Sequence, residues 1–279
     1  MPVGKIKNLI LLILALAVCF LLVLVIPSKT AQAREEAAVH ERLQTLFAGY
    51  DVQLSGDELP ASARLYTIEL ENSRTAESTA AAVLLGAQSE PQDSSVRYSS
   101  VYTSPHGSCR MNASGSFSAS LDGWFTASDP VSGTRKLLKA MGFDAASVSE
   151  PERVSAGVYA VTAAQQILGV PAFSEGLRFT YTNGALTDVS GIFFLSGSVT
   201  RVSENACISC ADALVALLAA RNTLGWVGSR ITDVRQGYEH TETASASVRL
   251  VPVWQIDTDT GAFRVNGITR EITAITASS

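Results

Sequence analysis

An unbroken apolar run of 18 residues, Leu9–Ile26, constrains this chain more than any other feature. At a helical rise of about 1.5 Å per residue the run is roughly 27 Å long, close to the ~30 Å hydrocarbon core of a bilayer. Lys5 and Lys7 precede the run, and basic residues on that side favour a cytoplasmic N-terminus. We therefore expect residues 1–33 to hold a short cytoplasmic start, a single transmembrane anchor in the cell membrane and a linker, with the remaining chain extracytoplasmic.

Two processing events compete with retention of this anchor. A signal peptidase would recognise Ala31-Gln32-Ala33 and cut after Ala33, although the run exceeds the ~7–15 apolar residues of a usual signal peptide. Lipidation at Cys19 is excluded, because Val18 stands where a small residue is required. Retention is the favoured interpretation. Ala15 and Cys19 then form a small-xxx-small pair, a candidate contact with another membrane helix, for which plain lipid exposure is the competing interpretation.

Composition limits what the rest of the chain does. Hydrophobic residues make up 47% and charged residues 17%, a mix that excludes disorder, a coiled-coil rod and a polytopic membrane protein. The formal net charge of −5 argues against binding of nucleic acid, which needs clustered Lys and Arg. Four cysteines and three histidines leave little material for a metal site, and we expect no cofactor.

Patterning beyond the anchor indicates two units, over residues 34–128 and 129–279. In the first we expect helices over 34–49 and 75–85, and strands over 51–54, 64–70, 96–103 and 108–121. The apolar stripe of the first helix is expected to be Val39, Leu43, Leu46 and Phe47. In the second we expect a helix beginning near Asp129, a hairpin at Asn183-Gly184, a helix over 207–224, and strands over 231–238, 245–257 and 262–266. Helices followed by antiparallel meanders predict an α+β fold.

Motifs for catalysis are missing from the sequence. It contains no Gly-x-Ser-x-Gly elbow, no His-Glu-x-x-His pair and no phosphate-binding loop. His40, His106 and His240 lack the spacing of metal ligands, and we expect them on solvated surfaces. A carboxylate pair assembled by the fold remains open, because such pairs need no proximity in sequence. We expect a protein that is not an enzyme.

The most chemically suggestive spacing is Cys207-Ile208-Ser209-Cys210. It falls at the start of a predicted helix, where the helix dipole lowers the pKa of cysteines in dithiol oxidoreductases. No βαβ unit precedes it, and no second cysteine pair completes a zinc site. Structural thiols or a local disulfide are favoured over redox catalysis and metal capture, and Cys109 is an alternative disulfide partner for either cysteine.

The last seventy residues carry a more distinctive pattern. It consists of Gly237-Tyr238 at the end of a predicted strand, Pro252-Val253-Trp254 within the next strand, and a hairpin that reaches Asn266. The pattern resembles exported PepSY-like and YycH/YycI-like domains. Because side chains alternate along a strand, we expect Trp254 to cover the helix. Pro252 removes a ladder donor, which predicts a sheet edge or a bulge.

The whole-chain plan is similar to that of YycI-type proteins, with one membrane helix and two PepSY-like α+β units. Gly49-Tyr50-Asp51-Val52, Leu59-Pro60 and Gly169-Val170-Pro171-Ala172-Phe173 add to the resemblance, which spans most of residues 5–273. The chain departs from the family in its Cys207/Cys210 pair and its scarcity of lysine.

The resemblance implies a regulatory function without catalytic residues. YycI-type proteins pair with a YycH-type protein and with the membrane sensor histidine kinase WalK (YycG) of Gram-positive bacteria, and so affect cell-wall homeostasis. Two alternatives remain: a PepSY-like inhibitor or chaperone of an exported peptidase, and a surface thiol oxidoreductase that uses Cys207 and Cys210.

Overall fold

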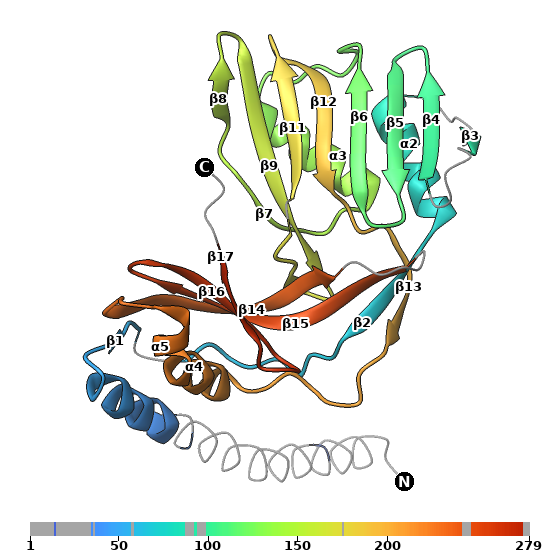
Figure 1. The fold of residues 1–279 in the computed structure, drawn as a ribbon. Helices are drawn as coiled ribbons and strands as arrows, with labels where there is room; N and C mark the ends of the chain where they lie inside the picture. Colours follow the sequence, from blue (N-terminus) through green and yellow to red (C-terminus); the bar gives the residue numbers. More distant parts are fainter. Residues whose placement is uncertain are drawn as a thin grey trace, which may run out of the picture.

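The computed structural model describes residues 14, 35, 37–56, 59–86, 92–93, 99–174, 176–241 and 247–275. Of the predicted anchor only Leu14 falls within these ranges, and the candidate contact residues Ala15 and Cys19 lie outside them. Among the described residues, no helix is both long enough and apolar enough to cross a bilayer. Two sheets with several helices form the fold, which confirms the α+β class (Figure 1).

The seven-stranded sheet is built from segments far apart in the sequence. Its strands are β1 (Gln53–Leu54), β2 (Ile68–Asn72), β13 (Ser196–Arg201), β14 (Arg230–Thr241), β15 (Ser247–Thr258), β16 (Gly261–Asn266) and β17 (Ile272–Ile275). They run in the order β1-β14-β15-β16-β17, and β2 pairs with both β13 and β15. The sheet is mixed, because β1 and β14 are parallel. A helix over residues 37–48, α4 (Cys210–Ala219) and α5 (Arg221–Leu224) lie below it in Figure 1.

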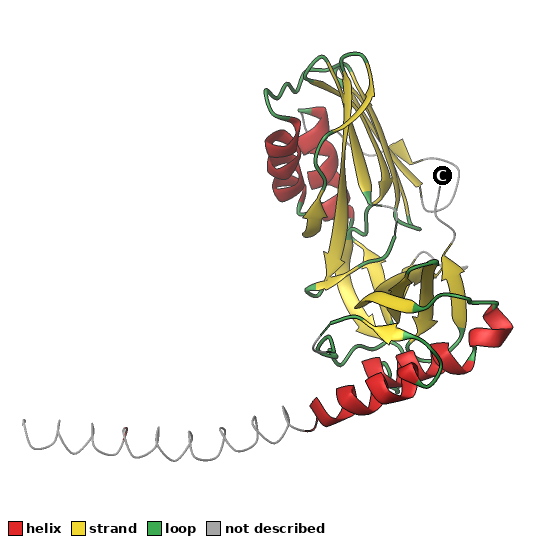
Figure 2. Ribbon diagram, turned by 90° about the vertical axis from the view of Figure 1, so that its left-hand side faces the viewer, coloured by secondary structure: helices red, strands yellow, loops and turns green. Residues whose placement is uncertain are grey.

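The ten-stranded sheet comes from the continuous stretch between β2 and β13, and its pairs are all antiparallel. The central order is β10-β9-β11-β12-β6-β5-β4-β3, and β7 and β8 also pair with β9. The bounds are β3 (Gln92–Asp93), β4 (Ser99–Ser104), β5 (Gly107–Asn112), β6 (Ser116–Leu121), β7 (Ala145–Val148), β8 (Glu152–Ser155), β9 (Val158–Ile167), β10 (Val170–Pro171), β11 (Leu177–Thr182) and β12 (Ala185–Ile192). Figure 2 shows α2 (Arg74–Leu85) and α3 (Pro130–Met141) packed on one face.

Short-range turn and cap signals predicted several elements correctly. Asn183-Gly184 joins β11 to β12, and both residues have positive φ, 52° and 82°, as a two-residue type I′ hairpin turn requires. Asp129 begins α3 by accepting hydrogen bonds from the backbone N–H groups of Val131 and Ser132. Gly142 ends that helix in the left-handed conformation.

Three expectations about local structure were wrong. Residues 108–121 form two strands, because Gly115 turns the chain at a φ of 87° between β5 and β6. The helix expected from residue 207 begins at Cys210, where Ser209 caps it. No strand was expected over β7–β10. The buried residues of β9 include Ala160, Ala163 and Gln165, which are not the β-branched or aromatic residues typical of strands, so its period of two is hard to recognise.

The helix over residues 37–48 buries most of the predicted apolar stripe: Leu43 and Phe47 are buried and Val39 is partly buried against the same core. Two single positions on this helix were wrong. His40, expected on the surface, is 8% exposed, whereas Leu46, expected in the apolar stripe, is 40% exposed. His40, Leu43 and Phe47 are buried together at the three- and four-residue spacing of one helix face. Leu43 and Phe47 belong to the core that α4 forms with β14–β16.

The expected boundary at 128/129 does not coincide with a division between the sheets. β6 precedes that position and β12 follows it, yet the two strands are paired neighbours. The chain passes between the sheets near Ser73 and again near Leu195, where the N–H of Ser73 donates to the Leu195 carbonyl at 3.4 Å. Pairing between strands distant in sequence leaves no local composition signal, which is why the sequence suggested a cut elsewhere.

Candidate functional site

Cys207 and Cys210 lie at the N-terminal end of α4, and both are free thiols. Burial raises the pKa of Cys210 to about 12. Burial is also the largest cause of a raised pKa at Cys207. Redox-active cysteines depend on a lowered pKa, because the thiolate is the nucleophile. The arrangement therefore opposes the chemistry of a dithiol oxidoreductase.

The loop that contains Cys207 packs against the seven-stranded sheet and is hydrogen-bonded to it. The N–H of Cys207 donates to the Leu65 carbonyl at 2.7 Å. The indole Nε1–H of Trp254 donates to the carbonyl of Ile208 at 2.9 Å, and the Trp254 ring is fully buried against α4, as its strand alternation predicted. A Cβ at Gly267 would lie 2.3 Å from Cys207 Sγ. These contacts hold the loop over residues 207–209, here called the cysteine loop, between α4 and β15.

Gly237 and Tyr238 form a contact between the two sheets. Ala172, just after β10, makes a parallel bridge with Tyr238 in β14, and the N–H of Phe173 donates to the Tyr238 carbonyl at 2.7 Å. A Cβ at Gly237 would lie 2.5 Å from the Phe173 ring and 2.6 Å from the Pro171 carbonyl oxygen. Glycine is needed at position 237 because any side chain would push β10 away from β14.

Pro252 lies neither on an edge strand nor at a bulge, contrary to expectation. It sits inside β15, opposite Tyr238 of β14. On the other side, β15 pairs with β2 up to Leu250 and with β16 from Val253. Pro252 therefore occupies the gap between two partners. Its carbonyl faces that gap and accepts from the N–H of Gly267 at 2.8 Å, so the missing N–H on the same side costs no ladder bond.

Asn266 shapes the turn that follows β16. Its side-chain oxygen accepts from the backbone N–H groups of Ile268 and Thr269 at 2.9 and 3.0 Å, and its own N–H donates to the Glu271 carbonyl. This is an Asx-type turn, in which a side chain replaces a backbone acceptor. The residues of the C-terminal pattern thus act in packing and in turns.

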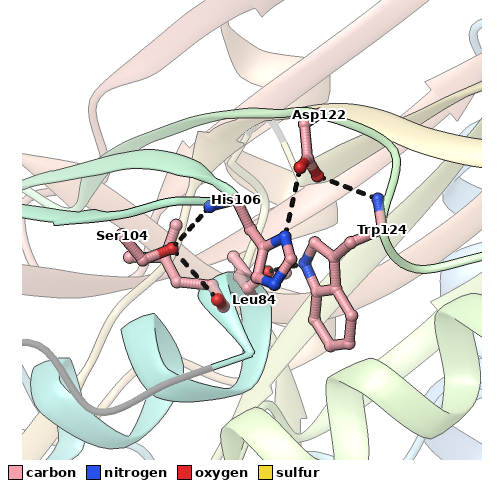
Figure 3. Close-up of polar contacts among 6 residues, drawn as sticks. Leu84, Ser104, His106, Asp122 and Trp124 are labelled. Atoms are coloured by element: carbon pink, nitrogen blue, oxygen red, sulfur yellow. Dashed lines mark hydrogen bonds and ion pairs between the residues drawn. The ribbon is translucent and has the colours of Figure 1, made fainter.

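Ser104, His106 and Asp122 bring together the residue types of a catalytic triad (Figure 3). His106 Nδ1 lies 3.1 Å from Asp122 Oδ2, and this hydrogen bond is the largest cause of the lowered pKa of Asp122. Ser104 Oγ, however, accepts from the backbone N–H of His106 at 3.0 Å and donates to the Leu85 carbonyl at 3.1 Å. Both hydrogen bonds of the Ser104 hydroxyl therefore run to the backbone, whereas a catalytic triad needs one from the serine to the imidazole.

Side chains of the same cluster donate hydrogen bonds to carbonyl groups at the C-terminal end of α2. The indole Nε1–H of Trp124 donates to the Leu84 carbonyl at 2.7 Å, beside the bond from Ser104 to Leu85 (Figure 3). The Trp124 and His106 rings lie 5.4 Å apart between centroids. Carbonyls in the last turn of a helix have no partner within the helix, and these side chains supply one. No spacing in the sequence linked these residues, because they meet only when β4, β5 and β6 align.

Within the described ranges, no group of three or more His, Cys, Asp and Glu side chains is arranged to hold a metal ion. The three histidines are separated. His40 lies on the helix over residues 37–48, His106 in the turn after β4, and His240 in β14 with its ring 5.5 Å from that of Phe194.

Comparison with known proteins gives similarity of fold only. No family model matches the chain, and no curated protein matches it significantly. An uncharacterized protein from Eubacterium rectale covers 77% of this chain and 86% of its own, with 9% identity and a TM-score of 0.48. The C-terminal domain of YpeB from Bacillus megaterium covers 75% of this chain and 100% of its own, with 14% identity and a TM-score of 0.40. At these TM-scores, neither similarity assigns a family.

Proposed function

We propose that this chain is a membrane-anchored, non-enzymatic extracytoplasmic regulator of a sensor histidine kinase in the manner of YycI-type proteins, acting with a YycH-type partner in cell-wall stress signalling. The observation that carries the proposal is the burial of the first helix after the apolar run. Leu43 and Phe47 of that helix belong to the core of the seven-stranded sheet. The N–H of Val52 then donates to the Phe47 carbonyl, which ties the helix end to the strand that follows.

This attachment suits transmission of a force or a rotation between membrane and ectodomain. A helix whose face is part of a close-packed core moves together with that core. In the proposed mechanism, the anchor packs against the kinase helices through Ala15 and Cys19, and the ectodomain holds it in one orientation. Only contacts that differ between the two states of the kinase shift its equilibrium.

The chemistry of the described residues is consistent with a regulator. The thiols of Cys207 and Cys210 have raised pKa values, and Ser104 is not bonded to the His106 ring. The pattern residues of the C-terminal part act in packing, as described above.

In-cell crosslinking of the full-length protein, followed by mass spectrometry, tests the proposal. A matched chain carries an unrelated polyleucine span in place of Leu9–Ile26, so that tethering is kept and the anchor surface is lost. We expect a histidine kinase among the crosslinked partners of the natural chain and its loss from the matched chain. Recovery of a peptidase or wall enzyme by both chains, without a kinase, would contradict the proposal.

Point variants locate the contact within the anchor. Replacing Ala15 and Cys19 together by Leu should weaken the effect of this protein on kinase activity, because bulky side chains at both positions prevent close approach of the helices. Ala17→Leu is the matched control, since position 17 lies on another face of a helix. Unchanged kinase output in the double variant would remove Ala15 and Cys19 from the contact.

A second candidate function is supported by the end of the seven-stranded sheet. β17 is the last strand in the order β1-β14-β15-β16-β17. An edge strand accepts an extended segment from another protein, as an inhibitor or chaperone of an exported peptidase requires. Inhibition of a co-encoded peptidase by the full-length protein, lost in an Ala274→Pro variant of β17, would favour this function over the kinase regulator.

A further inference from the structure

A groove of about 630 Å³ lies in the angle between α3 and β7. The second half of α3 forms one wall, β7 forms the other, and the turn after Gly142 closes one end. The side chains that matter for its chemistry are Arg135, Lys139, Phe143, Asp144 and Val148. The groove belongs to the ten-stranded sheet and is separate from the kinase-regulator surfaces proposed above.

The strand wall of the groove has a free edge. Within the described strands, β7 pairs with β9 alone. The N–H of Gln166 donates to the Asp144 carbonyl, and the N–H of Ser149 donates to the Thr162 carbonyl, so these bonds are directed toward β9. The register of β7 against β9 shifts between Ala145 and Ser147, which interrupts the strict alternation of its backbone groups. The backbone groups of β7 that are not bonded to β9 face the other side, where the described chain offers no strand.

This edge is short and has a register shift between Ala145 and Ser147, but it lacks two other protections of natural edge strands. Its sequence is Ala145-Ala146-Ser147-Val148, without a charge or a proline. Ala146 and Ser147 are exposed and small, so their side chains leave room for an added strand. An edge of this kind is a template for an extended segment of another protein.

The helix wall of the groove is basic. After residue 34 the chain has two lysines, Lys136 and Lys139, and both stand in α3 beside Arg135. Arg135 and Lys139 are exposed, one turn apart, and line the groove. Neither forms an ion pair with another described residue. Hydrogen bonds from Ser132 are the main cause of the lowered pKa of Asp129, and the charge of Arg135 adds to it. In a chain of net charge −5, this concentration of cations favours a negatively charged ligand.

Asp144 sets the orientation of such a ligand. It lines the groove near the start of β7, where its Oδ1 accepts a hydrogen bond from Gln166 Nε2 at 2.8 Å. A ligand carboxylate is repelled there and attracted at the α3 wall. Because side chains of a strand alternate, a segment with acidic residues at every second position meets both requirements.

We propose that the α3–β7 groove binds an extended acidic segment of a partner protein, which adds to β7 as a strand and directs its carboxylates toward Arg135 and Lys139. Main-chain hydrogen bonds to β7 supply affinity, and the charges select the sequence.

Fluorescence anisotropy with the full-length protein in a zwitterionic detergent tests this site. The probe is a fluorescein-labelled octapeptide of alternating Glu and Val. We expect saturable binding that weakens as salt is added, since exposed charges are screened. A Lys-Val octapeptide should not bind. A Glu-Val peptide N-methylated along its hydrogen-bonding edge should lose binding, and retention of binding would overturn strand addition.

Variants of α3 separate the groove from general charge attraction. Arg135→Ala combined with Lys139→Ala should weaken binding about five- to tenfold, as expected for two exposed ion pairs. Lys136→Ala is the matched control, because Lys136 is exposed on α3 but does not line the groove. Equal circular dichroism melting of the variants checks their folding. Equal loss in the control, no loss in the double variant, or binding to anionic phosphatidylglycerol vesicles in place of the peptide would each overturn the proposal.

Discussion

The two sheets differ in whether their buried polar groups have hydrogen-bond partners. In the ten-stranded part, Glu77 accepts hydrogen bonds from Ser100 at 2.9 Å and Tyr102 at 3.4 Å, with Arg74 at 3.6 Å. Gln165 likewise exchanges two hydrogen bonds with the backbone of Phe194. In the seven-stranded part, the buried atoms without a partner among the described residues are His40 Nδ1 and Nε2, Trp226 Nε1 and Arg264 Nε.

This difference follows the way each part is assembled. The ten-stranded sheet comes from one continuous stretch, and its buried polar groups are satisfied within it. The seven-stranded sheet gathers segments from both sides of that stretch and carries the helix that follows the predicted anchor. Each buried unsatisfied group costs about 1–3 kcal/mol, and such groups in a native protein call for an explanation. In the proposed function, the unsatisfied groups lie in the seven-stranded sheet, which is coupled to the membrane. The ten-stranded sheet is then a support whose buried polar groups are satisfied internally.

The largest expected effect is on the core of the seven-stranded sheet. Trp254→Ala should destabilise the protein by about 3–5 kcal/mol, because it empties a fully buried site and leaves the Ile208 carbonyl without its donor. Hydrogen exchange should show lost protection over β14–β16 and kept protection over β9, β11 and β12. Equal loss in both sheets would show that they unfold as one unit and would break the comparison.

Removal of a satisfied polar group should be the next largest effect. Glu77→Leu should destabilise the ten-stranded sheet by about 2–3 kcal/mol, because the buried Ser100 and Tyr102 hydroxyls lose a charged acceptor. Urea unfolding followed by circular dichroism measures the change. Glu77→Gln is the control, since it keeps one acceptor oxygen, and should cost less. A stabilised Glu77→Leu variant would mean that the network is not satisfied as described.

Each sheet also holds one deeply buried thiol, for which we expect equal behaviour. Burial raises the pKa of Cys109 and of Cys210 to about 12. Because the folded pKa exceeds the unfolded value near 9, the stability from each thiol is complete below pH 9 and is lost as pH rises toward 12, by about 1.4 kcal/mol per pH unit. Urea midpoints between pH 7 and 10.5 should fall, and should fall less in Cys109→Ala or Cys210→Ala. Rapid alkylation of either folded thiol at pH 8 would contradict this prediction.

Local chemistry in the sequence predicted much of this structure, and non-local pairing escaped it. Asn183-Gly184 and Asp129 act within a few residues of themselves, so their turn and cap were recognisable. Trp254 was placed correctly because strand alternation is also local. The pairing of β6 with β12 and the contact of Gly237 with Phe173 depend on segments far apart, for which one sequence contains no signal.

The helix over residues 37–48 shows a different limit. Ranking residues by hydrophobicity put Leu46 inside and His40 outside, whereas packing follows the spacing of His40, Leu43 and Phe47. The spacing was present in the sequence. The polar character of histidine outweighed it in the prediction, although the structure buries that ring.

Replacement of an unsatisfied polar group should have the opposite sign to Glu77→Leu. His40→Leu should stabilise the protein by about 1 kcal/mol, because a buried ring with two partnerless nitrogens is exchanged for an apolar side chain. The thermal midpoint of the full-length protein in detergent measures it. Leu46→His, at an exposed site on the same helix, is the control and should change little. Destabilisation by His40→Leu would show that the ring has a partner beyond the described residues.

The smallest expected effect compares helix caps, where the two sheets should not differ. Ser73 accepts from the N–H of Ala76 at the start of α2, and Ser209 accepts from the N–H of Asp212 at the start of α4. Each Ser→Ala change should cost about 1 kcal/mol, and each Ser→Gly change only a few tenths. Urea unfolding with hydrogen exchange of each first turn measures both. Ser209 lies between Cys207 and Cys210, in the loop that packs between α4 and β15. If Ser209→Ala cost much more stability than Ser73→Ala, the packing of this loop would depend on the helix cap.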